Sequence, residues 1–194
     1  MRASNQPSVA SGAQSVRAGD LAFARMEKVN AELVAIMYGS LVSHLLKTKG
    51  KEVVLADLER IGHSMGTRLV DEFLAKFGTP ACQTFKDSME VLSKVAMKMF
   101  LGIEAELTEL GPKSFVVAFA ENPLNDFVEL PQELREPGRF SYSRIYCGLI
   151  RGAFEHLHMR VGCEYVKDTL LGDETNAIQV EFLGTLLTVD DDDE

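Results

Sequence analysis

Hydrophobic residues recur with a helical period through much of this chain, and several of the predicted helices are apolar on more than one side. The spacing predicts helices over residues 31–47, 53–77, 84–100 and 142–159. Asn30 precedes the first of these as an N-cap, Gly78 and Pro80 end the second, and a shorter helix is expected to begin at Asp20. Because a surface helix normally has a single apolar stripe, these helices are expected to be covered on more than one side.

Beyond Gly102 the hydrophobic period shortens to that of strands. Residues 114–120 are apolar on both faces, which is typical of a covered central strand. Residues 161–169 and 177–183 predict an antiparallel hairpin, and residues 104–107 alternate as a short strand. The predicted fold is therefore α+β: about five helices packed on a small, mostly antiparallel four-stranded sheet.

A length of 194 residues suits a single domain, which we expect to span residues 20–187. Residues 1–19 are rich in Ser, Ala, Gly and Gln and predict a disordered tail; their sparse apolar residues disfavour the alternative of a transit peptide. Residues 188–194 form an acidic tail. The net charge of −9 argues against nucleic-acid binding, because phosphate contacts favour basic surfaces.

The sequence has three cysteines, no secretory leader and no apolar run of the roughly 20 residues that a membrane span needs. Together these features predict a protein of a reducing, cytoplasmic compartment. His156 and His158 lie about 200° apart on a helix and so cannot share an ion, and no metal site or catalytic residue is expected.

Two predicted helices have more apolar circumference than one core requires, which favours obligate subunit interfaces. In the helix over 142–159, Gly148 and Gly152 permit close approach of another backbone. Arg151 lies between Ile150 and Gly152 and needs a partner, either within the fold or across an interface. The expected interface residues are Leu33, Ile36, Met37, Leu41, Gly148 and Gly152.

Five collinear stretches over roughly residues 30–185 resemble the subunit 3 family of the transport protein particle (TRAPP) complex. They are NAELVAIMYGSLV, IGHSMGTRLVDEFLAKFG, KVAMKMFLGI, ENPLNDFVELP, and CGLIRGAFE followed by CEYVKDTLLGD. The resemblance implies the same α+β fold and a non-catalytic core subunit. It implies related small TRAPP subunits as obligate partners, with a homodimer when the chain is alone. The implied complex tethers vesicles and is an exchange factor for a Rab-type GTPase, peripheral at endoplasmic reticulum and cis-Golgi membranes.

Cys82 follows Pro80 at the start of a predicted helix, where the helix dipole can lower the pKa of a thiol; a small buried hydrophobe is the alternative. The resemblance implies an apolar channel near this cysteine, which carries a long-chain acyl group such as palmitate as a thioester. The family has a basic residue directly before the cysteine, whereas this chain has Ala81, which leaves acylation open. The expected channel lining is Met65, Phe73, Phe85, Met89, Leu92, Met97 and Met99.

The acidic tail has two interpretations. It can be a solvated end, or, as the resemblance implies, a segment that reaches the nucleotide pocket of the GTPase through Asp192, Asp193 and Glu194. Two other functions are kept beside the TRAPP assignment. One is a stand-alone sensor of fatty acyl groups or small ligands, and the other is an acyltransferase that turns over at Cys82.

Overall fold

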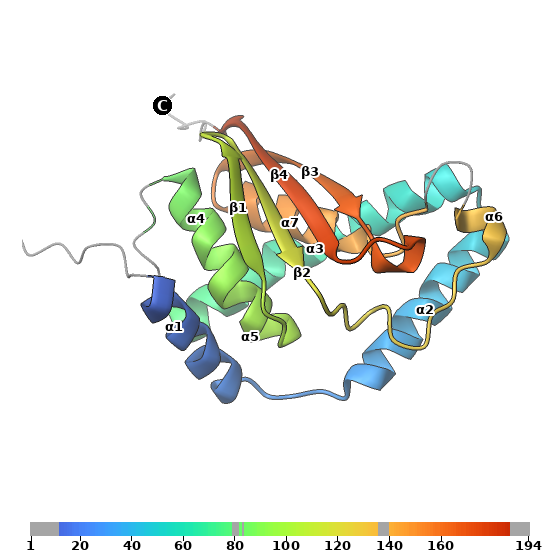
Figure 1. The fold of residues 1–194 in the computed structure, drawn as a ribbon, viewed down its shortest axis with the longest axis horizontal. Helices are drawn as coiled ribbons and strands as arrows, with labels where there is room; N and C mark the ends of the chain where they lie inside the picture. The colour runs from blue at the N-terminus through green and yellow to red at the C-terminus, as the bar shows by residue number, and fades with distance from the viewer. Residues whose placement is uncertain (1–11, 79–81, 83, 136–139, 187–194) are drawn as a thin grey trace, which may run out of the picture.

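Helices cover one face of a four-stranded antiparallel sheet in the computed structural model, which describes residues 12–78, 82, 84–135 and 140–186 (Figure 1). The longer helices are α1 (Gly12–Arg25), α2 (Ala31–Thr48), α3 (Lys51–Phe77) and α7 (Ile145–His156). The shorter ones are α4 (Phe85–Val91), a π-helix (Leu92–Ala96), α5 (Met97–Leu101), α6 (Gln132–Arg135) and a 3₁₀ turn (Thr169–Leu171). The strands are β1 (Glu106–Gly111), β2 (Ser114–Phe119), β3 (Met159–Lys167) and β4 (Asn176–Thr185).

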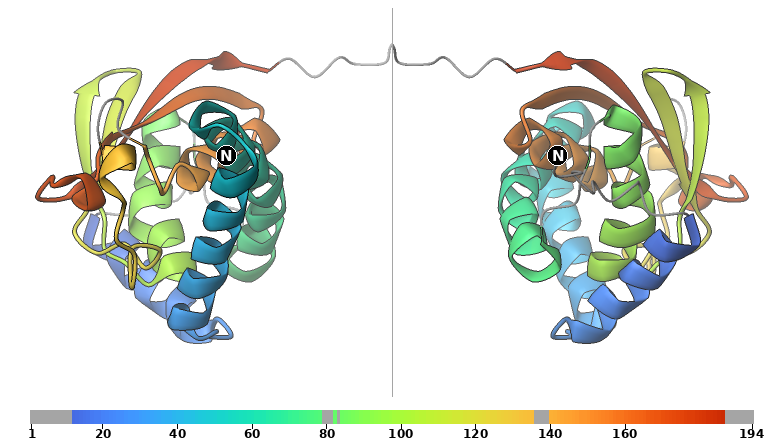
Figure 2. Two further views of the ribbon diagram at one scale, coloured as in Figure 1. Left: turned by 90° about the vertical axis from the view of Figure 1, so that its right-hand side faces the viewer. Right: turned by 90° about the vertical axis from the view of Figure 1, so that its left-hand side faces the viewer.

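The sheet has the order β1-β2-β4-β3, and every neighbouring pair is antiparallel. Alternate residues of β2 and β4 point to the helices and are buried, among them Phe115, Val117, Ile178 and Val180. The two side views show the strands as a curved layer on one side of the helices (Figure 2). The predicted α+β class and four-stranded sheet are confirmed.

Residues 85–101 form one continuous helical stretch, the α4–α5 segment, with the π-helix in its middle. Its start is fixed by a capping box in which the Thr84 hydroxyl accepts from the Asp87 N–H while the Asp87 carboxylate accepts from the Thr84 N–H. Asn30 caps α2 in the expected manner, its side-chain oxygen accepting from the Leu33 N–H at 2.9 Å. The predicted helix over 84–100 is therefore correct, apart from the π-turn.

Helix α7 packs against α3 on one side and against the sheet on another, which accounts for its wide apolar circumference. A Cβ at Gly152 would lie 2.2 Å from the main-chain oxygen of His63 on α3, so the glycine is required for this close approach. Gly148 faces the same helix. The prediction that Gly148 and Gly152 form a subunit interface was wrong, because α3 of the same chain already occupies their surface.

Helix α1 begins at Gly12, so the expected boundary between tail and domain at Asp20 was wrong; Asp20 lies inside the helix. The small residues that resembled a flexible tail are suited to close packing. A Cβ at Gly19 would lie 2.3 Å from the Lys94 oxygen, and Ala22 is buried. Tertiary contacts of this kind stabilise a helix that its own propensity would not. Residues 1–11 and 187–194 lie outside the described part of the chain.

Candidate functional site

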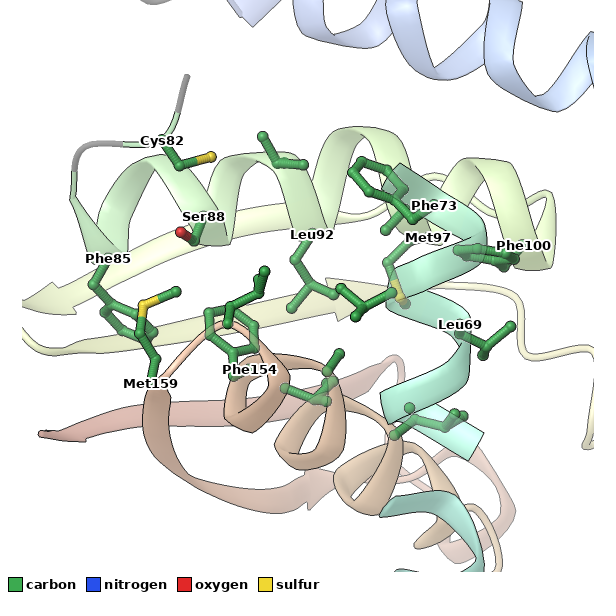
Figure 3. Close-up of a pocket in the computed structure, with 18 of the residues that line it drawn as sticks. Leu69, Phe73, Cys82, Phe85, Ser88, Leu92, Met97, Phe100, Phe154 and Met159 are labelled. Atoms are coloured by element: carbon green, nitrogen blue, oxygen red, sulfur yellow. The ribbon is translucent and has the colours of Figure 1, made fainter. Parts of the chain in front are cut away.

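A cavity of about 550 Å³ lies between α3, the α4–α5 segment, α7 and β4. Its volume falls in the range of about 300–1,000 Å³ that is usual for small-molecule sites. The wall is almost entirely apolar, and no described residue that lines it carries a charge or an imidazole. Prominent wall residues are Leu69, Phe73, Phe85, Leu92, Met97, Phe100, Phe154 and Met159 (Figure 3).

Four of the seven residues expected to line a channel do line this cavity: Phe73, Phe85, Leu92 and Met97. The other three do not and are corrections to the predicted set: Met65, Met89 and Met99. Met65 is 42% exposed on α3, whereas the two others are buried in the hydrophobic core without lining the cavity. Helical spacing explains the difference for Met89, because residues 85, 88 and 92 share the cavity face and residue 89 is rotated by about 100° from residue 88.

Helix α7 supplies a large part of the wall that the sequence analysis missed. Tyr146, Leu149, Ile150, Ala153 and Phe154 all line the cavity. Their spacing of three and four residues marks a second apolar stripe on this helix, and that stripe was the available signal. It was assigned to a partner surface, whereas part of it faces an internal space.

Cys82 lies at the rim of the cavity, beside the first turn of α4 and close to Ser88 in the close-up (Figure 3). The residue is solvent-exposed as a whole, yet partial burial raises the pKa of its thiol. The Asp87 carboxylate also raises this pKa, and a hydrogen bond with Ser88 opposes both effects. The expected lowering of the pKa by the helix dipole was wrong, because desolvation raises the pKa of this thiol and the Asp87 carboxylate at the same helix end raises it further.

The other two cysteines are poor nucleophiles. Cys147 is fully buried on α7, and desolvation raises the pKa of its thiol to about 12. Burial also raises the pKa of Cys163 well above its usual value. Burial disfavours the thiolate, which is the reactive form of cysteine. Of the three thiols, that of Cys82 is the exposed one. Ala81, which precedes it, lies outside the described residues.

Arg151, which was expected to need a partner, is paired within the chain. The Nη1 of Arg151 lies 2.8 Å from an Oε of Glu59 on α3, and Arg144 pairs with the other oxygen of the same carboxylate. Nearby, the Nε2 of His156 lies 3.1 Å from Asp71 Oδ1. The described residues hold no group of three or more side chains that could bind a metal ion.

The outer face of α2 is apolar and exposed: Leu33 is 57% exposed, Ile36 58% and Met37 63%. Leu41, which was expected beside them, is half-buried against the core of this chain. Asp192, Asp193 and Glu194 lie outside the described residues, so their predicted contact stays a prediction. No helix in the described ranges has the length and apolarity that crossing a bilayer requires.

Comparison with known proteins places these features in a family context. A model of the transport protein particle (TRAPP) component family matches residues 34–181. The chain is 42% identical over 165 residues to the trafficking protein particle complex subunit 3 of Dictyostelium discoideum, a match that covers 84% of this chain and 88% of the relative. It is 39% identical to transport protein particle subunit bet3 of Schizosaccharomyces pombe, with 84% and 88% covered.

Among solved structures, the chain is similar to a trafficking protein particle complex subunit 3 from Naegleria fowleri that is covalently bound to palmitic acid. The identity is 47% and the TM-score 0.79, and the match covers 84% of this chain and 100% of that chain. An H-NOX protein from S. oneidensis has a TM-score of 0.54 at 8% identity, covering 81% of this chain and 78% of that chain. Such a low identity indicates a shared fold and nothing of shared chemistry.

Proposed function

Because the chain belongs to the TRAPP component family, with subunit 3 proteins as its relatives, we propose that it is the subunit 3 component of a TRAPP complex and stores a long-chain acyl group in its cavity. The observation that carries the acyl part is the apolar cavity of about 550 Å³ with an accessible thiol at its rim. The palmitic acid held covalently by the Naegleria fowleri relative supports the same assignment.

The chemistry is a transfer between two thioesters. The Cys82 thiol loses its proton, and its Sγ attacks the carbonyl carbon of a long-chain acyl-CoA. The new S–C bond forms as the bond to the CoA sulfur breaks, and the CoA thiolate leaves and takes up a proton. Burial of the chain favours the product by roughly 0.8 kcal/mol per CH₂ group. Binding of the chain in the cavity also holds the carbonyl beside the sulfur, which offsets the unfavourable raised pKa.

The composition of the wall supports a stored acyl group and argues against turnover. A transferase or thioesterase needs a group that activates water or another acceptor. No residue among those described at the cavity wall is acidic, basic or a histidine. The thioester is therefore expected to persist, and the chain acts as a structural subunit with no catalytic cycle of its own.

The exposed face of α2 is the proposed contact with a related small TRAPP subunit. Leu33, Ile36 and Met37 present adjoining apolar side chains, which are typical of an obligate interface. The proposed activity of the assembled complex is nucleotide exchange on a Rab-type GTPase at endoplasmic reticulum and cis-Golgi membranes. Asp192, Asp193 and Glu194 are the proposed contact with that GTPase.

Intact mass spectrometry of the full-length protein from its native cells tests the acyl proposal. We expect one added long-chain acyl mass that hydroxylamine removes, its absence in the Cys82→Ser variant, and its retention in the matched Cys163→Ser variant. An unmodified mass in the wild-type chain would overturn this part. Affinity purification tests assembly: stoichiometric recovery of related small subunits supports it, and elution as a lone chain or homodimer overturns it.

A further inference from the structure

Helix α1 precedes residue 34, where the family match begins, and it docks directly behind the cavity wall. It lies along the π-helix and α5, as Figure 1 shows. The contact is close and specific. A Cβ at Gly19 would lie 2.3 Å from the Lys94 oxygen, and the Phe23 ring lies over Gly102, 3.2 Å from where its Cβ would be. A salt bridge of 3.8 Å joins Asp20 to Lys98.

The packing behind the wall is shared with the cavity. Ala22 of α1 is buried in a small cluster with Phe73, Val95 and Met99. Several side chains of that cluster or packed against it also line the cavity, namely Phe73, Leu74, Val91, Ala96 and Phe100. In the close-up, Phe73 and Phe100 lie at the opposite side of the cavity from Cys82 and Phe85 (Figure 3). Support from α1 therefore reaches the end of the cavity that a chain extending from Cys82 would meet last.

The helix that α1 touches is irregular at this point. Through residues 92–96 the hydrogen bonds follow the π pattern, with the Met97 N–H donating to the Leu92 carbonyl. Return to an ordinary α-helix would shift the register by one residue and rotate the following turn by about 100°. That rotation would move Met97, Phe100 and Leu101 away from the cavity, and all three now line it. The Lys94 oxygen that Gly19 contacts belongs to the π-turn itself.

We propose that α1 clamps the π-turn from behind and so fixes the end of the cavity opposite Cys82, which makes α1 the element that sets the length of the bound acyl chain. This proposal rests on the acyl-binding function proposed above. With α1 docked, Phe73 and Phe100 stop the chain at a fixed distance from Cys82. With α1 displaced, these side chains lose the packing on their outer side, and a longer chain is accommodated.

Gly19→Ala in the full-length protein is the sharpest test. The new Cβ meets main-chain atoms of Lys94, which cannot give way as a side chain would, while no cavity residue changes. Alanine also favours helix formation over glycine by about 1 kcal/mol, so the variant weakens docking without weakening the helix. Phe23→Ala, which removes the packing on Gly102, is a second, milder variant. Leu21→Ala, on the exposed side of α1, is the control.

Each protein is incubated with an equimolar mixture of lauroyl-, myristoyl-, palmitoyl-, stearoyl- and arachidoyl-CoA, and the acyl masses are read by intact mass spectrometry. For wild type and Leu21→Ala we expect uptake to fall sharply beyond one length. For Gly19→Ala and Phe23→Ala we expect the optimum to move to a longer chain. The ratio of the longer to the shorter acyl group should rise at least fourfold, roughly the factor for one further buried CH₂. Identical profiles in all four proteins would overturn the role of α1 and leave the acyl proposal standing.

A second measurement separates the two proposals. The Cys82→Ser background, with and without Gly19→Ala, is titrated with the corresponding free fatty acids by calorimetry. A shift of the preferred length there supports the α1 clamp even if no thioester forms. If the wild-type chain takes up neither acyl-CoA nor free fatty acid, both proposals fall.

Discussion

Gly148 of α7 lies directly against the main-chain oxygen of Glu59 on α3, at a point where a Cβ would approach that oxygen to 2.1 Å. The contact is reciprocated, because a Cβ at Gly62 of α3 would lie 2.2 Å from the Ile145 oxygen of α7. Gly66 and Gly152 repeat the arrangement one turn further on. The two helices therefore touch through their backbones, and the face of α7 opposite α3 is left free to cover the sheet and the cavity.

Gly148→Ala is expected to lower the free energy of unfolding by about 3 kcal/mol or more, at the upper end of the cost of overpacking, since the new methyl group meets main-chain atoms. Gly111→Ala is the matched control, because nothing lies within 4 Å of its would-be Cβ. Urea denaturation followed by circular dichroism measures both. A Gly148→Ala protein as stable as the control would mean that the helices separate more easily than the structure indicates.

Glu59 binds Arg151 of α7 and Arg144 at the N-cap of that helix. Glu59→Gln should cost about 1–2 kcal/mol of stability, since charge-assisted hydrogen bonds are stronger than neutral ones. The matched change Glu72→Gln removes an exposed pair with Lys76 four residues along the same helix. That pair should contribute less than about 0.5 kcal/mol. Thermal unfolding at low and high salt distinguishes the two: added salt should screen the exposed Glu72 pair, while the loss at the largely buried Glu59 carboxylate should persist. Equal losses at high salt would remove any special role for Glu59.

Much of the fold could be predicted from the sequence, because local periodicity determines it. Nearby residues were enough to predict the N-cap of α2 at Asn30 and the end of α3 at Gly78. They also predicted β2, from a segment that is apolar on both faces. A short helix was expected from Asp20, but the start of α1 at Gly12 could not be predicted in this way. The small residues Gly19 and Ala22 stabilise this helix by packing against the π-turn, which lies some seventy residues further along the chain.

The site was predicted only in part, for a related reason. Periodicity indicates that a face is covered but not what covers it. The apolar and glycine faces of α7 were therefore assigned to a partner subunit, although α3 and the cavity occupy them. The expected lowering of the pKa of Cys82 by the helix dipole failed because desolvation raises this pKa, and the charge of the capping residue Asp87 at the same helix end adds to that rise.

The hydroxyl of Ser88 is the group that lowers the pKa of Cys82, against burial and the Asp87 charge. Since the pKa of this thiol is raised, the thiolate is a minor form at neutral pH, and the rate of acylation by palmitoyl-CoA should climb as the pH rises toward that pKa. Ser88→Ala removes the lowering interaction, so the profile should move to higher pH with an unchanged plateau. Ser93→Ala, a hydroxyl removed from the same helical stretch but away from the cavity, should leave the profile unmoved. A shift in the opposite direction for Ser88→Ala would show that its hydrogen bond favours the neutral thiol.

A substitution on the outer face of α2 tests whether its exposed apolar side chains bind a partner subunit. Ile36 is 58% exposed, so Ile36→Asp leaves no buried charge and should change the free energy of unfolding by less than about 0.5 kcal/mol. If this face binds a related subunit, the same substitution places an unpaired carboxylate in a desolvated interface and should weaken binding by at least tenfold. Val53→Asp is the matched control, since Val53 is 52% exposed at the start of α3 and lies outside the α2 face. Co-purification with related small subunits measures the effect. Exposed apolar patches on soluble proteins often mark interaction sites, which is why we expect a partner to cover this face. Equal recovery of related subunits by both variants would mean that the assembly surface lies elsewhere on the molecule.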